Sequence, residues 1–343
     1  MKKKLFIFLF IGLLAITLVG CGKKASDKDN KNKKDDDNVV NQDNQSDDKV
    51  DIIDVNSNSR PFAVVVNNTP VAVGVQEGLN KAYIVYELPT EGSTSRLIAL
   101  YKDPIDLKVG TIRSVRHNFA DFAFESNAIL VAYGWSHYAQ DELQGGGIIN
   151  NINGIVEGPF WRENPEDLAS EHTAYTNISQ LKDYAIKKGY SLEGDNTILL
   201  NYSTGDVDLS SKDDVINATH LVIPYGNIVT EFYYNNDEKM YTKVVNGAWI
   251  TDYATGENIT TKNIIIEKIT YNVTDDGYYW NLHDVGTGDG YYITNGKAVP
   301  IKWSKANRTS KTVYTYLDGT EIEVSDGRTY IEVQVTNQST TIE

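Results

Sequence analysis

The chain has 343 residues, of which 41% are hydrophobic, and 47 Asp and Glu against 32 Lys and Arg give it a formal net charge of −15 at pH 7. This length provides for about two domains with buried cores, and the hydrophobic content excludes a wholly disordered chain. The acidic balance and the lack of a basic stripe exclude nucleic acid as an expected partner. The single cysteine excludes an intrachain disulfide framework and a cysteine-based zinc site.

Residues 1–20 have the plan of a lipoprotein signal peptide. Three lysines precede an apolar run over 5–19, which is too short to span a bilayer because a crossing helix needs about 20 apolar residues. The run ends in Leu-Val-Gly-Cys21, which resembles the lipobox of bacterial lipoproteins. This resemblance implies cleavage before Cys21 and a diacylglycerol on its thiol. A plain secretory signal with a chance cysteine is the alternative.

Residues 21–59 are predicted to hold the lipidated cysteine and a disordered linker. Polar and charged residues dominate this segment, and it shows no strand or helix period. We expect the folded part of the chain to begin at Arg60 and to stand away from the membrane. The expected location is extracytoplasmic, with the lipid on Cys21 holding the protein to the outer face of the cytoplasmic membrane.

Residues 60–210 are predicted to form a mixed α/β domain. Short apolar runs typical of covered strands lie at 62–66, 82–86, 96–101 and 128–133. Apolar residues at helical spacing occupy 117–126, 136–143 and 178–188. Strands mixed with short helices indicate an α/β or α+β arrangement.

Residues 211–343 are predicted to form a second, mostly β domain. Strand-like segments lie at 229–234, 239–245, 262–273, 278–282, 290–293, 311–316, 320–324 and 329–335. Asn-Gly, Thr-Gly and Asp-Gly dipeptides separate many of them and supply the positive φ of tight hairpins. We therefore expect an antiparallel meander, either a barrel or a curved sheet. The overall class is α+β, with a mixed α/β N-terminal domain followed by a mostly antiparallel β C-terminal domain.

Elements in both predicted domains match a known pattern. They include Arg60-Pro61, Val85-Tyr86-Glu87, Glu91-Gly92 with Arg96, Arg113-Ser-Val-Arg116, Asp121, His172-Thr173, Gly286-Thr-Gly288, Asn295-Gly-Lys297 and Trp303. These elements resemble the YerB family of bacterial lipoproteins, which carries a domain of unknown function. The chain departs from the family pattern at Asn67, where the pattern has an aspartate. The resemblance implies an N-terminal domain, a companion C-terminal domain and an envelope location, but no settled reaction.

A basic segment stands out in this acidic chain. Arg113, Arg116 and His117 lie within five residues, where a predicted strand meets a predicted helix. Guanidinium groups and helix-end N–H groups both favour carboxylate or phosphate. The segment therefore predicts an anion-binding site, to which we add His172.

Acidic residues near this segment support two interpretations. We expect Glu87 and Glu91, together with Arg96, to orient the arginines toward a ligand. Alternatively, Glu87, Glu91 or Asp121 pairs with the arginines and holds the domain together, because internal ion pairs of this kind are common.

A second class of function is an envelope hydrolase that acts on glycan or peptide. Glu87 and Glu91 lie in a turn-rich segment at a predicted strand end, where one of them would act with His117 as acid and base. No Walker loop, dinucleotide fingerprint or nucleophile elbow is present, so we expect no nucleotide and no cofactor. The histidines lack the i, i+4 spacing of metal ligands, so we expect no metal.

Consecutive aromatic residues crowd one predicted hairpin of the second domain. Tyr278, Tyr279 and Trp280 cannot all face one side of a strand, so part of this group is expected to be exposed. Exposed aromatic side chains stack on sugar rings or anchor protein interfaces. Core packing is the alternative.

The sequence is interpreted as a membrane-anchored binding or scaffold protein of a Gram-positive cell envelope. Its expected partners are the membrane, through the lipid on Cys21, and cell-wall polymer or wall-building proteins. The envelope hydrolase is the alternative, and a purely structural partner subunit is a third possibility.

Overall fold

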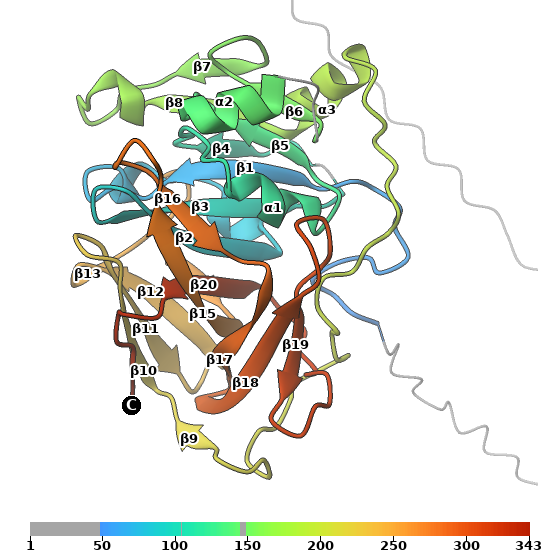
Figure 1. The fold of residues 1–343 in the computed structure, drawn as a ribbon, viewed down its shortest axis with the longest axis vertical. Helices are drawn as coiled ribbons and strands as arrows, with labels where there is room; N and C mark the ends of the chain where they lie inside the picture. The colour runs from blue at the N-terminus through green and yellow to red at the C-terminus, as the bar shows by residue number, and fades with distance from the viewer. Residues whose placement is uncertain (1–48, 104, 145–148) are drawn as a thin grey trace, which may run out of the picture. The chain divides into compact units, whose positions relative to one another are not determined.

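A twelve-stranded sheet runs through the part of the chain that the computed structural model describes, residues 49–103, 105–144 and 149–343 (Figure 1). Its main path follows the order β19-β18-β17-β15-β20-β2-β3-β1-β5-β6. The N-terminal half supplies β1 (Phe62–Asn67), β2 (Ile84–Thr90), β3 (Thr94–Tyr101), β5 (Ile129–Ala132) and β6 (Asn151–Asn153). The C-terminal half supplies β15 (Asn263–Val273), β17 (Gly286–Thr294), β18 (Lys297–Lys305), β19 (Val313–Tyr316) and β20 (Thr329–Val335). Off this path, β16 (Trp280–His283) pairs with β15, and β9 (Ile216–Asn217) pairs with β18.

The two halves of the chain meet inside this sheet. Strand β2 pairs in parallel with β20, from Ile84 opposite Thr329 to Glu87 opposite Glu332. Strand β20 also pairs in parallel with β15. Backbone hydrogen bonds therefore join the regions on either side of residue 210 into one sheet. The boundary between two domains at residue 210 stays a prediction from the sequence.

Two smaller sheets accompany the large one. One has the order β13-β12-β11-β10-β21, with β14 paired to β12; it contains β10 (His220–Pro224), β11 (Val229–Asn235), β12 (Met240–Val245), β13 (Ala248–Trp249), β14 (Thr260–Thr261) and β21 (Thr341–Ile342). We call it the second sheet. The other has the order β4-β8-β7, formed by β4 (Lys108–Gly110), β8 (Ala174–Asn177) and β7 (Phe160–Arg162).

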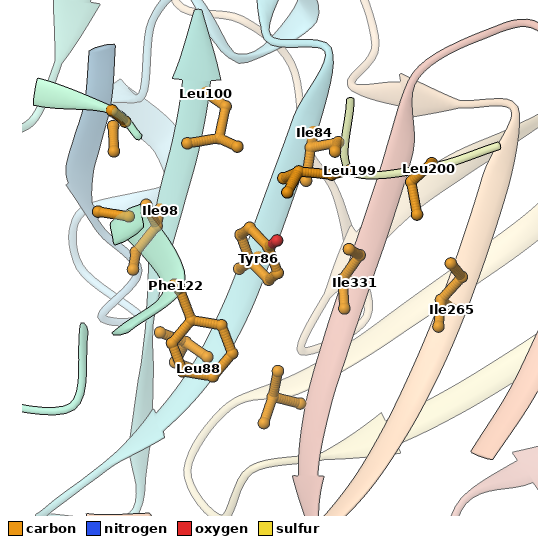
Figure 2. Packing of buried hydrophobic residues seen from close by; sticks show 14 of the residues in the cluster. Ile84, Tyr86, Leu88, Ile98, Leu100, Phe122, Leu199, Leu200, Ile265 and Ile331 are labelled. Atoms are coloured by element: carbon orange, nitrogen blue, oxygen red, sulfur yellow. The ribbon is translucent and has the colours of Figure 1, made fainter. Parts of the chain in front are cut away.

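Apolar side chains cover both faces of the large sheet. On one face, Tyr86 of β2 packs against Phe122 of α1 (Phe119–Phe124) with ring centroids 5.2 Å apart. Leu199 and Leu200 lie over β2, β20 and β15 on the same face (Figure 2). On the other face, residues of the second sheet such as Phe232 pack in a separate cluster. Alternation along the strands sends successive side chains to opposite clusters, which explains why β2 is buried throughout.

The predicted elements are found with shifted ends. The three predicted helices are present as α1, α2 (His137–Gln144) and α3 (Ile178–Lys187). The structure is mostly sheet with a few short helices, which agrees with the mixed class in broad terms; the finer α/β arrangement of the N-terminal part stays a prediction. The predicted strand at 320–324 is wrong, because only isolated bridges occur there.

The antiparallel meander is present over β17, β18 and β19, but its middle strand was not predicted. Pro300 interrupts the pattern of β18, and proline normally argues against a central strand. On the side away from β17, β18 pairs with β9 at Lys297 and Ala298 and with β19 from Ile301 onward. Pro300 lies between these two partners, so its missing N–H breaks no ladder bond.

The ordered body begins before Arg60, where the sequence predicted linker. Val50 and Ile53 are buried, and Ile53 belongs to the same core cluster as Tyr86. The backbone N–H groups of Asp51 and Ile52 donate to the carboxylate of Asp326 at 2.7 and 3.0 Å. Isolated apolar residues give no period, which is why this segment was assigned to the linker.

The predicted signal peptide, Cys21 and most of the predicted linker lie outside the described residues. Within the described ranges, no helix combines the length and the apolar character needed to cross a bilayer.

Candidate anion-binding site

The basic segment lies beside Glu91 where β1 and β2 end and β3 begins. Glu91 lies in the turn between β2 and β3, and Arg96 lies on β3 opposite Asn67 of β1. The segment that follows β4 runs along β1 and β5, because the N–H of Arg113 donates to the Val65 carbonyl at 2.9 Å. Four of the predicted site residues, Glu91, Arg96, Arg113 and Arg116, are thereby gathered, and we call them the arginine cluster.

Arg116 is held by Glu91 in a nearly buried ion pair. Its Nε lies 2.9 Å from each carboxylate oxygen of Glu91, and the two side chains are only 12% and 8% exposed. Burial raises the pKa of Glu91, but the hydrogen bonds and charge of Arg116 outweigh burial and leave the pKa below its usual value. This pair is the internal arrangement that the sequence offered as an alternative.

Arg113 lacks such a partner. Its Nη1 donates to the backbone carbonyl of Glu171 at 2.9 Å, and its Nε is buried with no hydrogen-bond acceptor in the described part of the chain. A buried N–H without an acceptor costs free energy, which a ligand oxygen would recover. Arg113 is therefore the member of the cluster that has no carboxylate partner within the described residues.

His172 lies on the same side as Arg113. The Asn67 Oδ1 accepts from Thr69, so its amide nitrogen faces Nδ1 of His172 at 2.8 Å. With Nδ1 as acceptor, the neutral imidazole carries its proton on Nε2 and can donate it. Burial and the nearby charge of Arg113 lower the pKa of His172.

The arginine cluster is locally cationic. Arg116 and Arg96 share one side-chain carboxylate, with Nη2 of Arg96 3.9 Å from Oε1 of Glu91, and the charge of Arg113 also acts on Arg96. Burial, and then the charge of Arg116, hold the pKa of Arg96 well below its usual value. A second anion would relieve this repulsion, so the geometry favours binding of a carboxylate or phosphate.

A hairpin formed by β15 and β16 of the C-terminal half contacts the arginine cluster. The ring of Tyr279 lies 5.2 Å from Cζ of Arg116, and Asp276 at the hairpin tip lies 3.6 Å from Nε2 of His137. Tyr278 is 59% exposed beside Tyr279, as expected for consecutive aromatic residues. An aromatic surface therefore adjoins the cationic groups.

Glu87 lies elsewhere, between the large sheet and the second sheet. It is fully buried, and its carboxylate accepts from Asn68, Ser95 and Thr230 and pairs with Lys243. These contacts do not orient Arg113 or Arg116. Within the described residues, the carboxylate that pairs with Arg116 is that of Glu91.

His117 and Asp121 line a separate pocket of about 450 Å³ with Arg308 and Glu142. Burial raises the pKa of Asp121 to about 6. The hydrogen bonds from Nε of Arg308 to the two carboxylate oxygens of Asp121, at 2.8 and 3.0 Å, act against this rise. Burial lowers the pKa of His117, and its Nδ1 is buried without a partner in the described residues. The same ranges contain no group of three metal-ligating side chains.

Sequence reasoning missed the partners that come from the C-terminal half. Lys243 pairs with Glu87, and Arg308 pairs with Asp121, at sequence separations of 156 and 187 residues. No local pattern marks either partner. The one available signal was the aromatic hairpin, whose expected exposure pointed to a surface but not to its place beside Arg116.

Comparison with known proteins assigns the chain to a family. The family described as "Protein of unknown function (DUF3048) N-terminal domain" matches residues 51–191. The companion family, described as the C-terminal domain of DUF3048, matches residues 221–331. The chain belongs to the DUF3048 family. The N-terminal match of this family starts at residue 51, in agreement with the packing of Val50 and Ile53.

Two comparisons link this DUF3048 chain to one relative. It is 29% identical over 276 residues to "Putative lipoprotein YerB" of Bacillus subtilis (strain 168), covering 80% of this chain and 81% of the relative. It also resembles the crystal structure of YerB protein from Bacillus subtilis, with a TM-score of 0.72 and 28% identity over 83% of this chain and 94% of that one. The resemblance seen in the sequence motifs is thereby confirmed.

Proposed function

We propose that this protein is a lipid-anchored binding protein of the cell envelope that takes an anionic group on its arginine cluster. The observation that carries the proposal is the side chain of Arg113, whose buried Nε has no acceptor among the described residues. Two further guanidinium groups, those of Arg96 and Arg116, belong to the same cluster and add positive charge. The expected ligands are cell-wall polymer or acidic segments of wall-building proteins, because the lipid on Cys21 would hold the protein among them.

The envelope location rests on two supports. The sequence before Cys21 has the form of a lipobox, and the similar protein of Bacillus subtilis is named as a lipoprotein. Labelled palmitate fed to cells should enter the wild-type protein and fail to enter a Cys21→Ala variant. Unprocessed wild-type protein in the soluble cell fraction would contradict the anchor.

Binding can be tested with the full chain purified in detergent. The probes are glycerol phosphate oligomers, which carry phosphate, and muramyl peptides, which carry carboxylate. We expect Arg113→Ala to weaken binding of at least one probe by about tenfold, because a charge-assisted hydrogen bond contributes about 1.5–3 kcal/mol. Lys302→Ala is the matched control, since Lys302 is an exposed lysine paired with Asp289 away from the cluster. Equal affinities of the two variants would refute the proposed site.

An envelope hydrolase remains the alternative function, but the contacts of its proposed acids do not favour it. A general acid needs a raised pKa and access to substrate, whereas Glu87 is fully buried and Glu91 has a lowered pKa. Turnover of purified peptidoglycan fragments by the wild type, abolished in Glu87→Gln or Glu91→Gln, would establish the hydrolase instead.

A further inference from the structure

The outer face of the second sheet carries an aromatic side chain in an unusual position. Along β12, Tyr241 and Val245 lie in the core, so the alternate residues Thr242 and Val244 point away from it. Both would be exposed on a bare sheet face, yet they are only 7% and 3% exposed. A side chain from a neighbouring strand must therefore cover them.

Tyr233 on β11 lies opposite Thr242, and Trp249 is the aromatic residue on the other side of β12. Trp249 lies on β13 opposite Val244 of β12, and β12 separates it from β11. Its ring nevertheless comes within 5.3 Å of the ring of Tyr233 on β11. Because neighbouring strands lie about 4.8 Å apart, the indole must extend across β12 to reach that position. Trp249 is still 57% exposed, so one face of the indole is open to solvent.

A carboxylate is fixed beside this open ring. Oε2 of Glu231 accepts from the Tyr233 hydroxyl at 3.2 Å and lies 3.0 Å from Nε2 of His220. His220 stacks on Tyr233 with centroids 4.1 Å apart and planes 18° apart. Both recorded contacts go to Oε2, so within the described residues Oε1 is left for an external donor. We call Glu231, Tyr233 and Trp249, with His220, the aromatic platform.

We propose that the aromatic platform binds a pyranose ring of a neutral glycan. The indole face offers a flat apolar surface for the C–H groups of the sugar, and the Glu231 carboxylate accepts from its hydroxyl groups. The aromatic platform carries a carboxylate beside its rings, whereas the arginine cluster is cationic. The two sites therefore recognise different chemistry on one body.

The charge of the platform argues against other occupants. Besides Glu231, the carboxylate of Glu343 lies 3.8 Å from Nδ1 of His220. Clustered carboxylates repel anionic lipid, nucleic acid and phosphate polymers. A stable protein interface buries about 800 Å² on each partner around an apolar centre, whereas this patch offers two exposed rings, Trp249 and Tyr233, beside a carboxylate.

The test is titration of the full chain in detergent with the hexamer of N-acetylglucosamine, followed by calorimetry. We expect saturable binding that Trp249→Ala weakens by about tenfold, because loss of the aromatic stacking contact costs about 1.4 kcal/mol. Glu231→Gln keeps the shape of the side chain and should weaken binding several-fold. Tyr253→Ala is the matched control, since Tyr253 is an exposed aromatic residue whose hydroxyl donates to Glu166 outside the platform, and its loss should leave the affinity unchanged.

Arg113→Ala separates this inference from the proposed function, because it should leave hexamer binding intact whether or not the arginine cluster binds anions. Absence of saturable binding by the wild type would overturn the glycan site. Equal affinities of the wild type, Trp249→Ala and Glu231→Gln would overturn it too. A change from dimer to monomer in light scattering on Trp249→Ala, without hexamer binding, would assign the face to self-association instead.

Discussion

Nζ of Lys243 lies 2.7 Å from Oε2 of Glu87, and the two side chains are 2% and 0% exposed. Lys243 belongs to the second sheet and Glu87 to β2 of the large sheet, so the pair joins the two layers. Burial acts to lower the pKa of Lys243, but the charge and hydrogen bond of Glu87, together with Tyr330 and Glu332, leave that pKa above its usual value. The buried charge of Lys243 is therefore compensated mainly by its contact with Glu87.

Replacing one partner should cost far more than an ordinary surface substitution. We expect Lys243→Met to lower the free energy of unfolding by about 3–5 kcal/mol, because it leaves the Glu87 carboxylate buried without a counter-charge. Denaturant unfolding of the full chain measures the change. Lys302→Met breaks an exposed pair and should cost less than about 1 kcal/mol. Equal costs for the two variants would show that the buried pair is not what stabilises the contact between the sheets.

This pair also shows how far the sequence could lead. The buried strand at 62–66 was predicted because a run of β-branched residues is typical of a strand that is covered on both faces, and β1 is buried throughout. The arginine cluster was predicted in part because Arg113 and Arg116 are close in the chain. Lys243 was not, since it comes from a strand whose pattern predicts only a half-buried surface, and its partner is 156 residues away. The parallel pairing of β2 with β20 is equally non-local, and no turn signal specifies it.

Arg113 and Arg116 should separate stability from binding. We expect Arg116→Met to lower the free energy of unfolding by about 3 kcal/mol, because Glu91 would keep only Arg96 at 3.9 Å. Arg113→Met should change it by less than about 1 kcal/mol, since it removes one exposed hydrogen bond to the Glu171 carbonyl and an N–H that has no acceptor within the described residues. Denaturant unfolding distinguishes the two. A larger loss for Arg113→Met would assign that residue to internal structure and weaken the anion site.

Glu267 should make stability fall with rising pH. Burial, and then the charge of Glu125, raise the pKa of this fully buried carboxyl to about 8, and Tyr314 donates to Oε2 at 2.9 Å. Between the ordinary value near 4.5 and about 8, the folded chain keeps a proton that the unfolded chain has released. The free energy of unfolding then falls by about 1.4 kcal/mol per pH unit over that window.

Glu267→Gln cannot titrate, so it should remove this dependence. The difference in unfolding free energy between variant and wild type should shift in favour of the variant by about 2.7 kcal/mol from pH 5 to pH 7. Glu323→Gln, at an exposed position, is the control and should show no such shift. A pH-independent difference for Glu267→Gln would mean that Glu267 is ionised in the folded protein.

Ile53 tests where the folded body begins. Its side chain is buried in the cluster that contains Tyr86, although the sequence before Arg60 is polar enough to be predicted as linker. We expect Ile53→Ala to lower the free energy of unfolding by about 2–5 kcal/mol, because it removes buried methyl groups and leaves a cavity. Ile105→Ala is the matched control, since Ile105 is half exposed and the same change should cost less than about 1 kcal/mol. Equal small effects of the two variants would assign residues 49–59 to the linker. The expected difference makes this segment part of the folded body, so a stable truncated form has to begin before residue 50.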